Sequence, residues 1–257
     1  MLLTEFDDNR QAIINPEDLN EPLEGFPKIA VSCFSRSTFQ RMLEMFPHEL
    51  IYETSMANVA IPIYKLVIDE QELALFNAPV GASACVAILE DIFALGAEKL
   101  VLFGTCGVLD EDIKETSIII PSHALRDEGT SFHYVEASDE IAVNVGVLDR
   151  FRSYLNERQI SHKEGKVWTT DGIYRETSAK LKVRKAAGAI CVDMECSAVA
   201  ALAAYRGFEL CHFFYAADHL SEEKWDIRTL SSHEDLDSKD RIAELAIQFA
   251  LFWGKAN

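Results

Sequence analysis

The sequence predicts an α/β fold in three layers, with a central mixed β-sheet flanked by helices. Short apolar runs typical of buried strands alternate with amphipathic segments along most of the chain. Hydrophobic residues make up 49% of the 257 residues, which is enough for a large core. Residues 1–25 are polar and acidic, and neither a linker nor an internal repeat follows them. We therefore expect an N-terminal extension over 1–25 and one domain over 26–257.

Strands are predicted where apolar residues cluster in short runs. These runs are 29–34, 58–68, 72–78, 99–105, 116–125, 163–170, 189–194 and 209–218. The second and third runs flank the turn Asp69-Glu70-Gln71, so they should form a hairpin. Because helical segments separate most of the others, the sheet should be mostly parallel or mixed.

Helices are predicted where apolar residues recur at helical spacing. The segments are 37–46, 83–95, 140–157, 177–187, 196–207 and a C-terminal helix that opens near Ser238 as its N-cap. Gly96 and Gly207 stand where C-cap glycines belong. Residues 126–139 and 219–237 are polar and are expected to be loops.

The formal net charge of −18 excludes some partners. An acidic surface repels phosphate backbones, so nucleic acid and anionic membranes are unfavourable partners, although a local pocket can still bind a small anion. The six cysteines form no CxxC pair, and most lie in apolar runs, which indicates reduced buried thiols and no metal site. The acidic start lacks signal-peptide features, and no apolar stretch is long enough to span a membrane. A cytoplasmic protein is expected.

Three strand ends carry residues suited to chemistry, and ligands collect at such junctions in α/β sheets. The first is Gly104-Thr105-Cys106-Gly107, where glycines allow backbone N–H groups to approach an anion and a hydroxyl adds a donor. Two glycines after a strand also make an ordinary turn, and the absence of a following Gly-Lys-Ser/Thr excludes a P-loop.

The other two junctions present carboxylates. In Val192-Asp193-Met194-Glu195, a carboxylate can accept hydrogen bonds from a ribose diol while Met194 packs against the sugar, or the acids can simply stabilise a helix N-terminus. In Ala217-Asp218-His219, a partly buried acid would have a raised pKa and could donate a proton, or it could cap a turn. The residues alone leave both alternatives open.

Taken together and in this order, these segments resemble the nucleoside phosphorylase superfamily over residues 28–254. This is the branch that holds purine nucleoside phosphorylases, uridine phosphorylases and methylthioadenosine/S-adenosylhomocysteine nucleosidases. The similar segments are PVGASACVAILEDIFALGAEKLVLFGTCGVL (79–109), RDEGTSFHY (126–134), TTDGIY (169–174) and VDMECSAVAA (192–201).

The resemblance implies a role for each matching residue. Thr105, with the backbone at Gly104, would contact phosphate or the water that replaces it. Met194 and Glu195 would hold the ribose, and Asp218 would protonate or hydrogen-bond N7 of a purine. Ile173 and Val192 would line the base. No cofactor is implied beyond inorganic phosphate as co-substrate, and a homo-oligomer between a dimer and a hexamer is expected.

The sequence departs from the family in the phosphate site. Leu102 occupies the place of a family arginine that bonds phosphate, and SCFSRS (32–37) replaces an N-terminal phosphate loop, with Arg36 as the substitute cation. Loss of that arginine is typical of hydrolytic relatives, but no glutamate stands out near the N-terminus to position water. His133 and Arg126 are candidates for an anion or sugar contact, and His133 could equally be structural.

The base site also departs from one branch. Thr177 and Ala179 stand where uridine phosphorylases carry a Gln-x-Arg pair that reads uracil, so a purine is favoured. Lys224 and Arg228 lie near the arginine that pairs with the catalytic aspartate in purine phosphorylases.

The leading hypothesis is a nucleoside-binding enzyme that cleaves the N-glycosidic bond of a purine nucleoside by phosphorolysis. The alternatives are hydrolysis, favoured by Leu102, and a non-catalytic nucleoside-binding protein of the same fold. A dinucleotide-binding dehydrogenase is excluded because no G-x-G-x-x-G follows the first strand.

Overall fold

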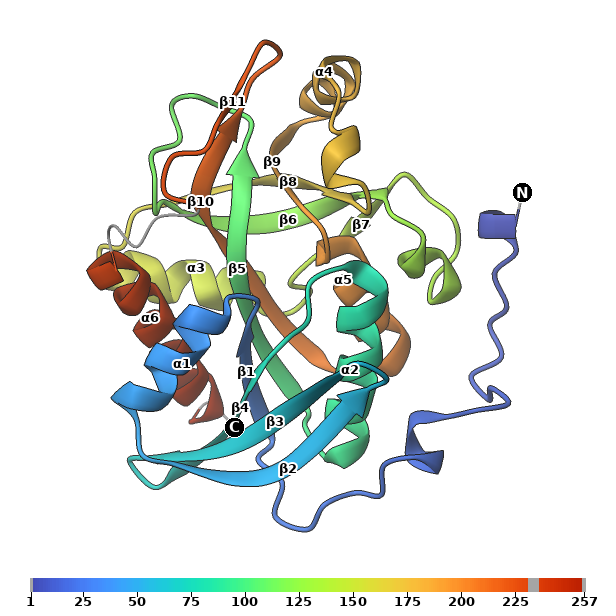
Figure 1. Ribbon diagram of the computed structural model, residues 1–257, viewed down its shortest axis with the longest axis vertical. Coiled ribbons are helices and arrows are strands. Elements are labelled where there is room, and N and C mark those ends of the chain that lie inside the picture. The colour runs from blue at the N-terminus through green and yellow to red at the C-terminus, as the bar shows by residue number, and fades with distance from the viewer. Residues whose placement is uncertain (1, 231–235, 256–257) are drawn as a thin grey trace.

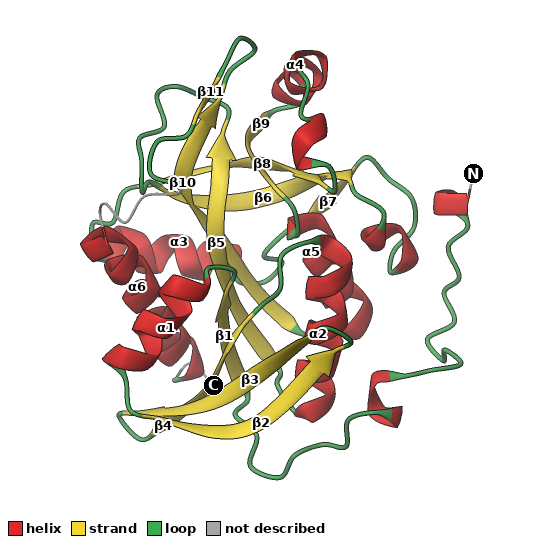
Figure 2. Cartoon of the chain, in the orientation of Figure 1, coloured by secondary structure: helices red, strands yellow, loops and turns green. Residues whose placement is uncertain are grey.

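The computed structural model describes residues 2–230 and 236–255 (Figures 1 and 2). Its strands are β1 (Ile29–Cys33), β2 (His48–Met56), β3 (Val59–Ile68), β4 (Gln71–Asn77), β5 (Lys99–Val108), β6 (Ile118–Asp127), β7 (Glu140–Ala142), β8 (His162–Thr170), β9 (Ala189–Asp193), β10 (Glu209–Leu220) and β11 (Trp225–Asp226). Its α-helices are α1 (Arg36–Met45), α2 (Ala82–Leu95), α3 (Leu148–Glu157), α4 (Ser178–Ala186), α5 (Cys196–Arg206) and α6 (Leu236–Gly254). Short 3₁₀ helices are η1 (Leu2–Thr4), η2 (Pro16–Asp18), η3 (Thr130–His133) and η4 (Ile173–Arg175).

The strands form one mixed sheet, as predicted, and part of it closes on itself. β1 pairs in parallel with β4 and β5, while β2, β3 and β4 form an antiparallel meander. β5, β10, β6, β8 and β9 pair in sequence, and β9 returns to β5, which makes a closed ring. Because a ring has no free edge, the long strands β5 and β10 are held on both sides.

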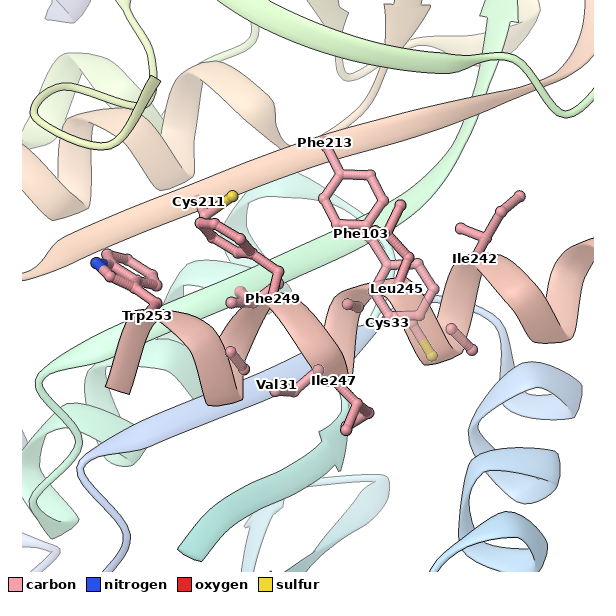
Figure 3. Packing of buried hydrophobic residues seen from close by; sticks show 14 of the residues in the cluster. Val31, Cys33, Phe103, Cys211, Phe213, Ile242, Leu245, Ile247, Phe249 and Trp253 are labelled. Atoms are coloured by element: carbon pink, nitrogen blue, oxygen red, sulfur yellow. The ribbon is translucent and has the colours of Figure 1, made fainter. Parts of the chain in front are cut away.

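Helices cover both faces of the sheet, so the three-layer prediction is confirmed (Figures 1 and 2). Alternate residues of β5 face opposite layers. Val101 and Phe103 pack with α1, α3 and α6, whereas Leu100 and Leu102 pack with α2 and α5. Figure 3 shows the first of these cores, in which α6 lies across β1, β5 and β10. Because successive side chains of one strand point to opposite faces of the sheet, a single apolar strand contributes to both cores.

One predicted helix begins later in the structure than expected. We expected a helix over 140–157, but β7 pairs with β6 and α3 begins only at Leu148. Asn144 and Gly146 between them adopt positive φ angles of 57° and 80°, which a helix does not allow. The Asn144 side chain bonds the carbonyl oxygens of Pro121 and His212, so tertiary hydrogen bonds hold the break.

The predicted loop over 219–237 also needed correction. β10 continues to Leu220, which pairs with Trp225 of β11, and His219 pairs with Asp226. Residues 231–235 lie outside the described residues. Ser238 is not an N-cap, because α6 is already helical from Leu236. Strand β2 was not predicted at all, and half of its residues are exposed.

The remaining sequence-level expectations concern the extension and the thiols. Residues 2–25 contain only the 3₁₀ helices η1 and η2, and Arg10 of this segment donates to the carbonyl oxygen of Tyr205 in α5. All six cysteines are buried and free, as predicted. No cluster of metal-ligating side chains and no helix that meets the length and apolarity of a membrane span occurs in residues 2–230 and 236–255.

Candidate active site

A cavity of about 630 Å³ lies where β5, β9 and β10 end. Predicted site residues from separate segments meet there: Thr105, Ile173, Val192, Met194, Glu195 and Asp218. A cavity of this size accommodates a small organic molecule. Its wall is largely apolar, so the few polar groups in it would fix the orientation of a ligand.

Glu195 is held at the cavity by a backbone donor. It is the N-cap residue of α5 and is 5% exposed, and its Oε1 accepts a 2.6 Å hydrogen bond from the N–H of Gly81. Gly81 has a φ of +99°, which favours glycine, at the start of α2. Burial, and then the charge of Asp193, raise the pKa of Glu195. A carboxylate so placed can accept hydrogen bonds from sugar hydroxyls.

Asp193 makes the capping contacts that were one of the two alternatives at this junction. Its Oδ2 accepts from the N–H groups of Glu195 and Cys196, at 2.9 and 2.7 Å, and its Oδ1 accepts from the Thr169 hydroxyl at 2.7 Å. Asp193 therefore caps α5 and fixes the backbone of Glu195. The capping interpretation holds for the first carboxylate, and the second is left to face the cavity.

Asp218 reaches the cavity through an irregularity in β10. The register against β5 shifts between Ala216 and Asp218, and such a bulge redirects side chains. The opposing Gly107 leaves room, since a Cβ there would lie 3.3 Å from Oδ1 of Asp218 and 2.5 Å from Leu220. Burial raises the pKa of Asp218, while a 2.7 Å hydrogen bond from Trp225 Nε1 to Oδ2 lowers it. The net rise shifts Asp218 toward the protonated form that a proton donor requires.

Thr105 lies between two cavities. Thr105 lines the large cavity and also an adjoining one of about 260 Å³, and the two share Phe34, Val80 and Leu230. Gly104 makes room for the Phe34 ring, because a Cβ at Gly104 would lie 2.7 Å from it. Leu102 is fully buried in the core against α2 and α5. It therefore supplies neither charge nor a hydrogen bond to this region.

The cavity wall contains an ionisable residue that the sequence analysis missed. Glu176, directly after η4, lines the cavity together with Ile173 and Val192. Burial, and then the charge of Asp218, raise the pKa of Glu176 to about 7. The signal was present in the segment TTDGIYRET (169–177), but we examined only Thr177 and Ala179 for base contacts.

Four predicted site residues are not part of the lining of the two cavities described above, and the first of them is Gly104, which is buried in β5. Arg36 is exposed at the start of α1. Arg126 is buried and donates to Ser131, Ser138 and the carbonyl oxygen of Glu136, so it orders the loop after β6. His133 is exposed in η3.

The expected basic partner of Asp218 is replaced by an aromatic one. Trp225 donates to Asp218, whereas Arg228 donates to the carbonyl oxygen of Ile113 and acts on Asp218 only through its charge. Lys224 lies in the turn between β10 and β11, where its N–H donates to the Ser221 hydroxyl. Trp225 escaped the sequence analysis because it lies in a segment that we expected to be a polar loop.

The chain is similar in sequence to curated proteins over part of its length. It is 28% identical over 159 residues to a purine nucleoside phosphorylase, DeoD-type, of Brevibacillus brevis, which covers 61% of this chain and 65% of that one. It is 26% identical over 183 residues to a DeoD-type purine nucleoside phosphorylase of Buchnera aphidicola, covering 70% and 76%. A guanosine phosphorylase of Halorubrum lacusprofundi is 23% identical over 147 residues, covering 56% and 61%.

Solved structures match the fold over nearly the whole chain. A uridine phosphorylase from Vibrio fischeri has a TM-score of 0.76 at 16% identity, covering 94% of this chain and 99% of that one. A purine nucleoside phosphorylase from Toxoplasma gondii in complex with immucillin-H has a TM-score of 0.76 at 17% identity, covering 93% and 98%. The family model for the phosphorylase superfamily matches residues 28–251. The chain belongs to the phosphorylase superfamily.

Proposed function

We propose that the chain cleaves the N-glycosidic bond of purine nucleosides by phosphorolysis, giving free base and ribose 1-phosphate. The observation that carries this proposal is the meeting of Thr105, Glu195 and Asp218 in one cavity. Relatives named as purine nucleoside phosphorylases support the purine assignment.

Each of these three residues has a proposed role in the reaction. Glu195 accepts hydrogen bonds from the ribose hydroxyls and so fixes C1′ of the sugar. As the bond from C1′ to N9 breaks, its electron pair moves into the base, and Asp218 gives its proton to N7. A phosphate oxygen held beside Thr105 then forms the new bond to C1′. Proton donation of this kind contributes typically about 10²- to 10⁴-fold to the rate.

The base itself is proposed to be a 6-oxopurine. Glu176 and Asp218 both line the cavity, and the charge of Asp218 contributes to the raised pKa of Glu176. An ionised carboxylate only accepts hydrogen bonds, so Glu176 would pair with N1–H of hypoxanthine or guanine. Adenine offers an acceptor at N1, which an ionised Glu176 would disfavour.

Hydrolysis is the second candidate, and the buried Leu102 is the observation that favours it. Without the family arginine, water could take the place of phosphate at Thr105. A non-catalytic nucleoside-binding protein is the third candidate.

The chain is further proposed to act in the cytoplasm as a homo-oligomer, with no cofactor besides phosphate. Large apolar side chains at the rim of the cavity support oligomerisation, since Ile173, Tyr174 and Trp225 are 52%, 95% and 58% exposed. A second subunit would cover such a rim.

The test is base release from inosine, guanosine, adenosine and uridine, measured with and without inorganic phosphate. We expect release from the two 6-oxopurine nucleosides that depends on phosphate and yields ribose 1-phosphate. Release at the same rate without phosphate would establish hydrolysis instead. Tight nucleoside binding without release would support the non-catalytic alternative.

A further inference from the structure

Helix α4 follows the cavity wall at Glu176 and is held by few apolar contacts. Of its nine residues, all of which the structure describes, only Leu181 is buried. Leu181 belongs to one apolar cluster with Val192 and Leu220, which line the large cavity. Thr177, directly after Glu176, is the N-cap of the helix. Because one buried side chain anchors a helix weakly, the place of Glu176 depends on what else holds α4.

Asp127, at the end of β6, joins α4 to the sheet. Its Oδ2 accepts hydrogen bonds from Nε1 of Trp168 at 3.0 Å and from Nζ of Lys180 at 3.1 Å. The same oxygen lies 3.3 Å from NH2 of Arg184, one turn further along α4. The Asp127 side chain is only 23% exposed, so solvent screens this cluster less than an exposed ion pair. One carboxylate thus ties the helix to both β6 and β8.

The cluster keeps Asp127 charged. Burial raises the pKa of Asp127, but the hydrogen bonds from Lys180 and Trp168 and the charge of Arg184 lower it, and the net shift is downward. The contact between α4 and the sheet therefore persists at neutral pH.

The cluster also decides where a positive charge lies beside Glu176. Lys180 follows Glu176 by four residues, and its ammonium group is held by Asp127. Burial, and then the charge of Asp218, raise the pKa of Glu176, and the charge of Lys180 opposes both. A released lysine side chain would extend into solvent, because its charge is strongly hydrated. Asp127 therefore keeps near Glu176 the cation that favours its ionised form.

We propose that Asp127 is a positioning residue for the base: it fixes α4 against the sheet and, through Lys180, prepares Glu176 to accept a hydrogen bond from a purine. Asp127 lines neither of the cavities at the site, so it acts without touching the substrate. The inference rests on the proposed function, in which Glu176 pairs with N1–H of a 6-oxopurine.

The first experiment measures the binding of hypoxanthine to the full chain by isothermal calorimetry at pH 8. It also measures the KM for ribose 1-phosphate in the reverse reaction. Asp127→Asn should weaken hypoxanthine binding by about tenfold, since the hydrogen bond to Glu176 is impaired. The KM for ribose 1-phosphate should not change. Asp127→Glu keeps the charge and should restore most of the binding.

The second experiment follows kcat/KM for inosine against pH. Lys180→Gln removes a positive charge beside Glu176, so the decline of kcat/KM on the acid side should move upward by up to about one pH unit. Asp127→Asn should move it in the same direction. Because Asp127 acts through Lys180, the double variant should show the shift of Lys180→Gln alone, whereas independent effects would add.

The control is Glu164→Gln. Glu164 accepts two hydrogen bonds of 2.9 Å from Arg152, which link β8 to α3, and it lines neither cavity. This variant should leave hypoxanthine binding and the pH profile unchanged. Thermal melting of each variant verifies that the fold persists.

Hypoxanthine binding and a pH profile in Asp127→Asn that match the parent would overturn the inference. Equal losses for hypoxanthine and ribose 1-phosphate, or additive shifts in the double variant, would also overturn it, because they indicate a general structural role. If no nucleoside is cleaved, the proposed function fails, and the calorimetric comparison with hypoxanthine still decides whether Asp127 positions a base.

Discussion

Strands β5 and β10 serve two different environments along their length. Near their middle, the rings of Phe103 and Phe213 stack with centroids 5.5 Å apart inside the core under α6 (Figure 3). A few residues further on, Thr105 and Asp218 line the cavity instead. The same two strands thus pass from a fully apolar region to one with buried carboxylates.

The difference shows which forces shape each region. The core gains stability from burial of apolar surface and from aromatic contacts. The cavity instead keeps Glu195 and Asp218 poorly solvated, which costs stability and raises the pKa of each carboxyl. Changes in the core should therefore alter stability, and changes in the cavity should alter chemistry.

The largest effect on stability is expected for Phe249→Ala. Phe249 is fully buried, and its ring lies 4.6 Å from that of Phe151 and 5.2 Å from that of Tyr154. The free energy of unfolding should fall by about 3–5 kcal/mol, as measured by denaturant unfolding. The kcat of the remaining folded protein should not change.

Phe252→Ala on the same helix is the matched control, because Phe252 is 37% exposed. It should cost clearly less stability than Phe249→Ala. Equal losses, or a specific loss of kcat in Phe249→Ala, would break the distinction between the two regions.

A smaller and more specific effect is expected for Glu176→Gln. The pKa of Glu176 is raised to about 7, so its ionised, accepting form is present above that pH and is lost as the pH falls through it. The kcat/KM of the parent for inosine should therefore decline below about pH 7. In Glu176→Gln, the kcat/KM for inosine should be about tenfold lower than that of the parent at pH 8, because one charge-assisted hydrogen bond is weakened. Its kcat/KM should also no longer decline as the pH falls below about 7, because the glutamine side chain does not titrate.

Adenosine should respond little to Glu176→Gln, and Glu111→Gln, at an exposed position, should match the parent with both substrates. An equal loss of kcat/KM for inosine and adenosine would mean that Glu176 does not distinguish the two bases.

The sequence predicted the parts of the fold that depend on periodicity. Strands such as 99–105 and helices such as 83–95 follow from apolar spacing, which reports which side chains are buried. The break between β7 and α3 could not be predicted, because it depends on hydrogen bonds from Asn144 to residues that are distant in sequence. Long-range contacts of this kind leave no local pattern.

The candidate site was predictable to the extent that it lies at strand ends. Thr105, Glu195 and Asp218 directly follow or end apolar runs, and all three line the cavity. Glu176 follows the segment that resembles the family's base-site strand and could have been considered, whereas Trp225 lies in a short hairpin that the sequence did not predict. Arg36 was predicted from its position in the segment that replaces the family's N-terminal phosphate loop, but it is exposed at the start of α1.

The most direct test of the account compares Asp218→Asn with the parent on two substrates. Inosine needs a proton on its leaving base, whereas 4-nitrophenyl β-D-ribofuranoside releases a phenolate that needs none. Asp218→Asn should lower the kcat for inosine by about 10²- to 10⁴-fold and leave that for the nitrophenyl riboside nearly unchanged. Equal losses on both substrates, or no loss on inosine, would contradict the assignment of Asp218 as the proton donor.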